Sequence, residues 1–189
     1  MKLKKKIIWI VVGIAAILGG KHIYDRHINN NFMEITEGKV YKSGVIPPDE
    51  IADYVAKYHI KSIVDLRFPG TGDDINNPEV PQELIAEKVA VEKIQGVNYF
   101  NNGSDQIPTE ANLTSFFKIM DNPDNYPVLI HCYHGIGRAQ LYSAIYRIEY
   151  EGMTNEEARH KITFPLLFSS FDDGTEKGEY LKAYRKHHP

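Results

Sequence analysis

The sequence predicts a three-layer α/β/α domain built around a largely parallel central sheet. Short β-rich apolar segments alternate along the chain with longer segments whose apolar residues recur at helical spacing, which is the pattern of parallel α/β folds. The 189 residues are enough for one domain of ordinary size. Apolar residues make up 42% of the chain and charged residues 25%, which is typical of globular rather than disordered proteins.

The first twenty residues differ in composition from the rest. Four lysines lie within residues 1–6, and residues 7–18 are apolar. This order is typical of signal peptides and signal anchors, and no Ala-x-Ala cleavage site is evident. We therefore expect residues 1–20 to form an uncleaved single-pass membrane anchor, although the apolar stretch is shorter than the ~20 residues of a usual span. The lysines favour a cytoplasmic N-terminus and an extracytoplasmic domain, with secretion after cleavage as the alternative.

Residues 21–31 are polar and are predicted to be a linker, so that the folded domain covers residues 32–189. The domain begins with a β-hairpin, because apolar and polar residues alternate on both sides of the turn at residues 37–38. Two prolines, Pro47 and Pro48, suit the first turn of the helix that follows. The other predicted elements are strands at residues 60–66, 97–100 and from 128, and helices at residues 81–94, 109–120, 140–150, from 154 and 176–187.

Residues 128–139 combine a buried strand, a loop with two glycines and the start of a helix. This arrangement is a natural anion site, because backbone N–H groups and the helix dipole face the ligand. Cys132 ends the strand and Arg138 begins the helix; a helix N-terminus and a nearby cation both stabilise a thiolate. The planar guanidinium of Arg138 matches the geometry of phosphate. A nucleophile and a phosphate clamp thus lie within one short segment.

The pattern His131-Cys132-x5-Arg138 resembles the signature loop of the protein tyrosine phosphatase superfamily. From about residue 32 to about residue 164 the chain is most similar to small bacterial dual-specificity-like phosphatases. In those proteins, as here, a Tyr-Lys-Ser-Gly stretch (residues 41–44) and an Asp-Leu-Arg stretch (residues 65–67) precede the signature. Members usually carry Ser or Thr directly after the arginine, whereas this chain has Ala139.

The resemblance implies a cysteine-dependent phosphomonoester phosphatase. Cys132 would attack phosphorus and form a phosphocysteine, which divides one difficult hydrolysis into two easier steps. Arg138 and the backbone amides of the loop would hold the non-bridging oxygens. His131 would position the loop rather than act as a base. Because the cysteine supplies the nucleophile, no metal or cofactor is expected. The loop residues that would bind phosphate are Tyr133, His134, Gly135, Ile136, Gly137 and Arg138.

Members of the family usually protonate the leaving group from an aspartate on a loop upstream of the cysteine. Asp105 fits this role, because it lies between a predicted strand and a predicted helix; an ordinary turn aspartate is the alternative. Weaker candidates are Asp73, Asp74 and Asp172. For Asp65 and Arg67 at a strand end, we favour a structural ion pair over a supporting role beside the phosphate loop.

The expected substrate is a phosphorylated protein or a small phosphomonoester. Tyr133 and Ile136 make the pocket wall apolar, which suits an aryl phosphate. The loop has no lysine, unlike family members that bind polyphosphoinositides, and this weighs against an inositol polyphosphate phosphatase, which stays an alternative. A pseudophosphatase that binds phosphorylated partners also stays open because of Ala139. The spacing of the arginine and the preceding histidine argue against a rhodanese-like sulfurtransferase.

Charge and cysteine content exclude several other classes. The net charge is −3, and four of the 22 basic residues but none of the 25 acidic residues lie in the first twenty positions. The rest of the chain is therefore clearly acidic, which argues against nucleic acid as a partner. Cys132 is the only cysteine of the sequence, so no intrachain disulfide and no cysteine-rich metal site can form.

Overall fold

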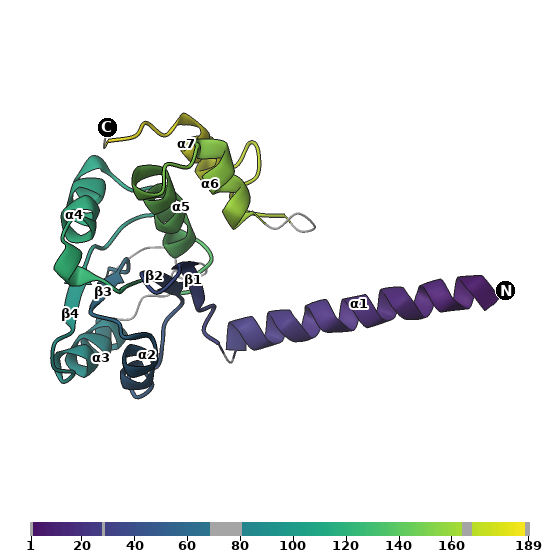
Figure 1. The fold of residues 1–189 in the computed structure, drawn as a ribbon, viewed down its shortest axis with the longest axis horizontal. Helices are drawn as coiled ribbons and strands as arrows, with labels where there is room; N and C mark the ends of the chain where they lie inside the picture. The colour runs from purple at the N-terminus through teal and green to yellow at the C-terminus, as the bar shows by residue number, and fades with distance from the viewer. Residues whose placement is uncertain (1, 28, 69–80, 164–167, 188–189) are drawn as a thin grey trace.

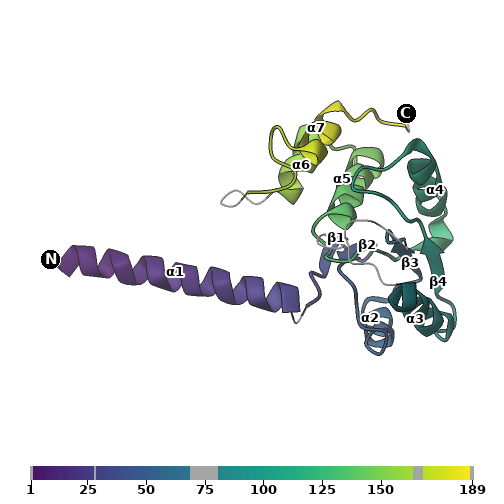
Figure 2. The ribbon, with the colours of Figure 1, turned by 180° about the vertical axis from the view of Figure 1, so that it is seen from behind.

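The computed structural model describes residues 2–27, 29–68, 81–163 and 168–187. Its five-stranded sheet has the order β1-β2-β5-β3-β4 and lies between helices on both faces (Figures 1 and 2). β1 is antiparallel to β2, whereas β2, β5, β3 and β4 are parallel. The predicted α/β/α class is confirmed. The strands are β1 (Met33–Thr36), β2 (Val40–Ser43), β3 (Ser62–Asp65), β4 (Asn98–Asn101) and β5 (Val128–His131).

Helices account for most of the remaining described residues, and their order agrees with the predicted alternation. Two of the predicted starts have the expected caps: Thr109 and Thr154 each accept a hydrogen bond from the backbone three residues on, in a capping box. The helices are α1 (Lys2–His27), α2 (Ile51–Tyr58), α3 (Pro81–Glu92), α4 (Glu110–Met120), α5 (Arg138–Tyr150), α6 (Asn155–Ile162) and α7 (Glu176–Ala183), with a 3-10 turn at Pro123–Asn125.

The central strand β5 separates two hydrophobic cores. Successive side chains of a strand point to opposite faces. Val128 and Ile130 therefore belong to the core under α4 and α5, whereas Leu129 belongs to the core under α2 and α3. Because both faces of β5 are buried, its near-continuous apolar sequence is that of a central parallel strand. The loop after β5 consequently emerges in the middle of the carboxyl edge of the sheet, where parallel α/β folds bind ligands.

The N-terminal helix α1 extends away from the sheet and its covering helices (Figure 1). It continues through residues 21–27, which we predicted to be a linker; the division into units at residues 1–20, 21–31 and 32–189 stays a prediction. Among the described residues, no helix combines the length and the apolar character that a membrane span requires. The predicted membrane anchor, and the extracytoplasmic location that depended on it, are therefore wrong. The apolar stretch of residues 7–18 is too short for a span of ~20 residues.

Candidate active site

The loop between β5 and α5, residues 132–138, is called the phosphate loop below. It begins at Cys132, which is buried, and ends where α5 begins at Arg138. Two backbone amides point at the cysteine sulfur: the N–H of Gly135 lies 3.3 Å from Sγ and that of Ala139 lies 3.5 Å from it. These donors stabilise negative charge on sulfur, as hydrogen bonds to a charged form do.

The carbonyl groups of the phosphate loop are held on its outer side. The carbonyl of Tyr133 accepts from the amide of Val45 at 3.0 Å. The side chains of Asn31 and Lys42 donate to the carbonyls of His134 and Gly135, both at 2.8 Å. Lys42 and Val45 lie in and after β2, and Asn31 precedes β1. Because the N–H of a trans peptide points away from its carbonyl, these three contacts turn the following N–H groups the other way, and that of Gly135 reaches the sulfur. This is the orientation that an oxyanion cradle needs.

Two glycines make this packing possible. Gly135 has a positive φ of 73°, and a Cβ there would lie 2.4 Å from the backbone nitrogen of Gly44. A Cβ on Gly44 would in turn lie 3.0 Å from the carbonyl oxygen of Tyr133. Any other residue at position 135 would force the loop away from β2. The Tyr-Lys-Ser-Gly stretch thus lies directly against the phosphate loop, a contact that no local sequence signal predicts.

A buried network of charges lies behind the loop, and it joins Asp65 and Arg67 to His131. The guanidinium of Arg67 binds both carboxylate oxygens of Asp65, at 3.0 and 2.8 Å, and also contacts Glu87. His131 Nε2 lies 2.8 Å from Glu87 Oε1. The structural ion pair that we favoured is therefore present, and it also reaches the residue that precedes Cys132. Glu87, on α3, was not singled out in the sequence, where it is one of many helical glutamates.

The network favours the charged forms of His131 and Asp65. Burial by itself lowers the pKa of His131, but the carboxylates of Glu87 and Asp65 outweigh it and raise the pKa above its ordinary value. Burial raises the pKa of Asp65, but His131 and Arg67 outweigh it and hold the pKa below its ordinary value. The carboxylates could in principle coordinate a cation with His131. However, Arg67 already binds oxygens of both, so the network supplies its own positive charge.

Arg138 is held at the carboxyl edge of the sheet. Its guanidinium NH1 donates to the carbonyl of Leu66 at 2.7 Å and to that of Ser104 at 3.1 Å. These carbonyls follow β3 and β4, so two neighbouring loops fix one side of the guanidinium. The side chain is buried but also borders the pocket next to Cys132. An arginine fixed in this way presents its remaining donors in a defined direction.

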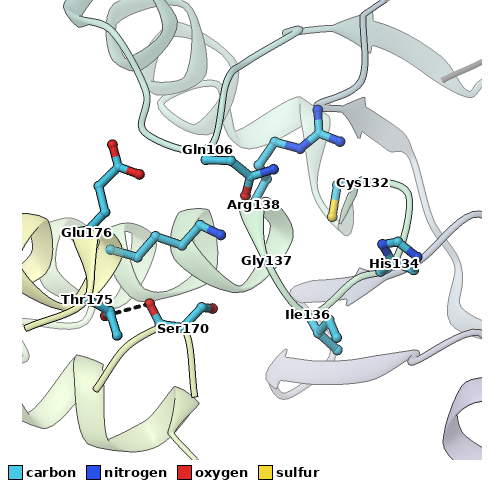
Figure 3. Close-up of a pocket in the computed structure, with 10 residues that line it drawn as sticks. Gln106, Cys132, His134, Ile136, Gly137, Arg138, Ser170, Thr175 and Glu176 are labelled. Carbon is cyan, nitrogen blue, oxygen red and sulfur yellow. Dashed lines mark hydrogen bonds between the residues drawn. The ribbon is translucent and has the colours of Figure 1, made fainter. Parts of the chain in front are cut away.

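A pocket of about 550 Å³ opens over the phosphate loop (Figure 3). One wall consists of Cys132, His134, Ile136, Gly137 and Arg138. The opposite wall comes from the loop after β4 and from the start of α7, which were not predicted to meet there. Ser170, Thr175 and Glu176 lie on the side of the pocket away from Cys132, and the carboxylate of Glu176 does not point toward the sulfur (Figure 3). The residues of this second wall are Gln106, Ser170, Thr175, Glu176 and Lys177.

The predicted acid, Asp105, does not line this pocket. It lies on the expected loop after β4, but its side chain is exposed and the neighbouring Gln106 lines the pocket instead. Among the described residues, Glu176 is the carboxylate that borders the pocket. Asp172 accepts a hydrogen bond from the amide of Ser169 at 2.8 Å and thereby stabilises a turn. The remaining candidates, Asp73 and Asp74, lie outside the described residues.

Comparisons with known proteins identify a matching family and similar folds. A model of the family described as DSP-PTPase phosphatase fused to NAD+ kinase matches residues 21–173. No curated protein sequence matches significantly. Similar solved structures include TpbA of P. aeruginosa, with a TM-score of 0.60 and 17% identity over 83% of this chain and 86% of that chain. The catalytic core of the PP-IP phosphatase Siw14 of S. cerevisiae, in complex with citrate, has a TM-score of 0.58 and 19% identity over 82% and 85%. At these identities the likeness shows the fold.

Proposed function

Because the chain belongs to this family of dual-specificity-type phosphatases, we propose that it hydrolyses phosphomonoesters through a phosphocysteine formed on Cys132. The chain is a phosphatase of the protein tyrosine phosphatase type, as the resemblance of its signature loop predicted. The cysteine mechanism is our proposal. The observation that carries it is the sulfur of Cys132, which faces the amides of Gly135 and Ala139 at the floor of a pocket bordered by Arg138.

In the first step the thiolate of Cys132 attacks phosphorus, so that an S–P bond forms while the P–O bond to the leaving group breaks. The inward amides of the phosphate loop and the guanidinium of Arg138 stabilise charge on the non-bridging oxygens. In the second step water attacks phosphorus and gives a proton to the carboxylate that protonated the leaving group, while the S–P bond breaks and the sulfur leaves as thiolate. Inorganic phosphate is released and the enzyme is regenerated.

The leaving oxygen needs a proton in the first step, and we propose that Asp105 supplies it. Support comes from its place on the loop that contributes the adjacent Gln106 to the pocket. The exposed side chain would have to turn toward the pocket when substrate is bound, and catalytic contacts often tighten only in such complexes. Glu176 is the competing acid, because it already borders the pocket. Comparing Asp105→Asn with Glu176→Gln on a poor leaving group distinguishes them.

We propose a phosphorylated protein or a small phosphomonoester as substrate. Ile136 is exposed and lines the pocket, where it provides apolar surface for an aryl group, whereas Tyr133 does not line the pocket. A variant of TpbA was solved in complex with phosphotyrosine, at 16% identity and a TM-score of 0.56 over 82% of this chain and 89% of that chain. An inositol polyphosphate is the second candidate, favoured by Lys177, which brings to the pocket wall the lysine that the phosphate loop lacks.

The full-length chain, assayed on an aryl phosphate beside Cys132→Ser, tests the proposal. We expect turnover by the natural protein and none above background by the variant, while both bind inorganic phosphate because the amides and Arg138 remain. An equal rate for the two proteins would exclude cysteine catalysis. Phosphate binding without turnover by the natural protein would instead identify a pseudophosphatase.

A further inference from the structure

Apart from Gln106, the second wall of the pocket is a hydrogen-bonded turn together with the start of α7 that follows it. The hydroxyl of Thr175 caps this helix by accepting from the amide of Gly178 at 3.1 Å. The same hydroxyl lies 2.8 Å from the carbonyl oxygen of Ser170, the hydrogen bond drawn in Figure 3, and 2.7 Å from that of Asp172. Asp172 closes the turn at its other end through the amide of Ser169. The turn and the first turn of α7 therefore form one unit.

Gly178 fixes how closely α7 approaches this turn. A Cβ at position 178 would lie 2.1 Å from the carbonyl oxygen of Asp172 and 2.8 Å from that of Phe171, distances that no side chain can accept. Phe171 is itself buried in the larger core. The backbone before Gly178 is thus anchored to the core of the domain. Lys177 directly precedes Gly178, so its backbone is held in place by the same contacts.

The side chain of Lys177 reaches the end of the phosphate loop. A Cβ placed on Gly137 would lie 3.4 Å from Lys177 Nζ and 3.5 Å from Gln106 Oε1. Gly137 directly precedes Arg138 and the first turn of α5. An ammonium group from α7 and an amide group from the loop after β4 therefore converge on the rim of the phosphate loop, and both line the pocket.

One phosphate group would be satisfied by the loop amides and Arg138, yet the pocket offers further space and a further cation. A volume of about 550 Å³ lies within the range of small-molecule sites. An ammonium is a compact point charge that can bind either a carboxylate or a phosphate. We infer that Lys177 is a specificity-determining residue that binds a second anionic group of the substrate, next to the scissile phosphate. The inference rests on the proposed phosphatase function.

Matched substrates test this assignment. The full-length protein is assayed on 3-carbamoylphenyl phosphate, on 3-carboxyphenyl phosphate and on 3-(phosphonomethyl)phenyl phosphate, which add a neutral group, a carboxylate and a non-hydrolysable second phosphate analogue. We expect Lys177→Met to lower kcat/KM on at least one doubly anionic substrate roughly tenfold more than on the neutral one, as for loss of one charge-assisted hydrogen bond. Because each substrate is compared between variant and natural protein, differences in leaving group cancel.

Lys182→Met is the matched control. It removes the same charge from the same helix, but Lys182 pairs with Asp173 at 2.7 Å and does not line the pocket. It should therefore leave the ratio between substrates unchanged. Equal losses by Lys177→Met on all three substrates, or no loss on any, would overturn the assignment while leaving the phosphatase function in place. Absence of turnover by the natural protein on every substrate would instead remove the proposed function. Comparing the losses on the carboxylate and the phosphonate substrates shows which of these two anions Lys177 binds better.

Discussion

Replacing Ala139 by serine is expected to speed the enzyme. The family usually has a hydroxyl at this position, which assists departure of the cysteine sulfur when water attacks the phosphocysteine. Alanine has no donor in its side chain, so hydrolysis of the intermediate should be the slow step of the natural protein. Ala139 is fully buried, and its own amide already lies 3.5 Å from Cys132 Sγ. A hydroxyl on the same residue would therefore start close to the sulfur.

The size of the gain follows from the donors that are already present. A hydrogen bond to a charged group contributes about 1.5–3 kcal/mol. The departing thiolate keeps the amides of Gly135 and Ala139 as donors, so an added hydroxyl should contribute somewhat less than this, about 1–2 kcal/mol. Since each 1.36 kcal/mol corresponds to a factor of ten in rate, Ala139→Ser should raise steady-state turnover roughly 5- to 30-fold.

Rapid-quench kinetics with a good aryl leaving group measure this step. We expect the natural protein to show a burst of released phenol and to accumulate phosphocysteine, and Ala139→Ser to shrink both. Ala139→Gly is the control, because it changes the residue without adding a hydroxyl and should keep the burst, at a helix cost of about 1 kcal/mol. The reasoning is refuted if the natural protein shows no burst and serine brings no gain, since another donor would then already assist the sulfur.

Three further changes test the site. Cys132→Ser should abolish turnover but keep phosphate binding by calorimetry, because an un-ionised hydroxyl is a poor nucleophile; a wild-type rate would contradict this. Asp105→Asn should lower kcat roughly 10²–10⁴-fold on a poor leaving group and less on a good one; if Glu176→Gln shows that pattern instead, Asp105 is not the acid. Glu87→Gln should lower the free energy of unfolding by about 3–5 kcal/mol near pH 6, because it breaks a buried ion pair. Folding raises the pKa of His131 above its value in the unfolded chain, which is about 6.5. The stabilisation that His131 gains from Glu87 is therefore complete below about pH 6.5 and is lost as the pH rises through the pKa of His131 in the folded protein. Denaturant unfolding at successive pH values should therefore show that the difference in unfolding free energy between Glu87→Gln and the natural protein becomes smaller at alkaline pH. A difference in unfolding free energy that does not change with pH would exclude a charged His131.

Local sequence alone determined the fold class and the centre of the site. The strand, the glycine loop and the helix start at residues 128–139 are contiguous, so Cys132 and Arg138 could be placed relative to each other without knowing any distant contact. Helix caps at Thr109 and Thr154 were visible for the same reason, because capping depends on residues three apart. The membrane anchor was predicted wrongly because a lysine cluster before an apolar run does not by itself distinguish a span from a shorter apolar stretch within a helix.

Only the tertiary structure decided what surrounds the phosphate loop. Lys42 and Glu87 lie far from Cys132 in the sequence. Lys42 nevertheless binds a carbonyl of the phosphate loop, and Glu87 contacts His131. Gln106 follows β4 and Lys177 lies on the last helix, α7, and both meet at Gly137. No periodicity or motif marks such residues, because their positions depend on which loops the parallel sheet brings together at its carboxyl edge. The sequence therefore specified the proposed reacting group, Cys132, and the loop around it, while the packing of distant segments decided the walls of the pocket.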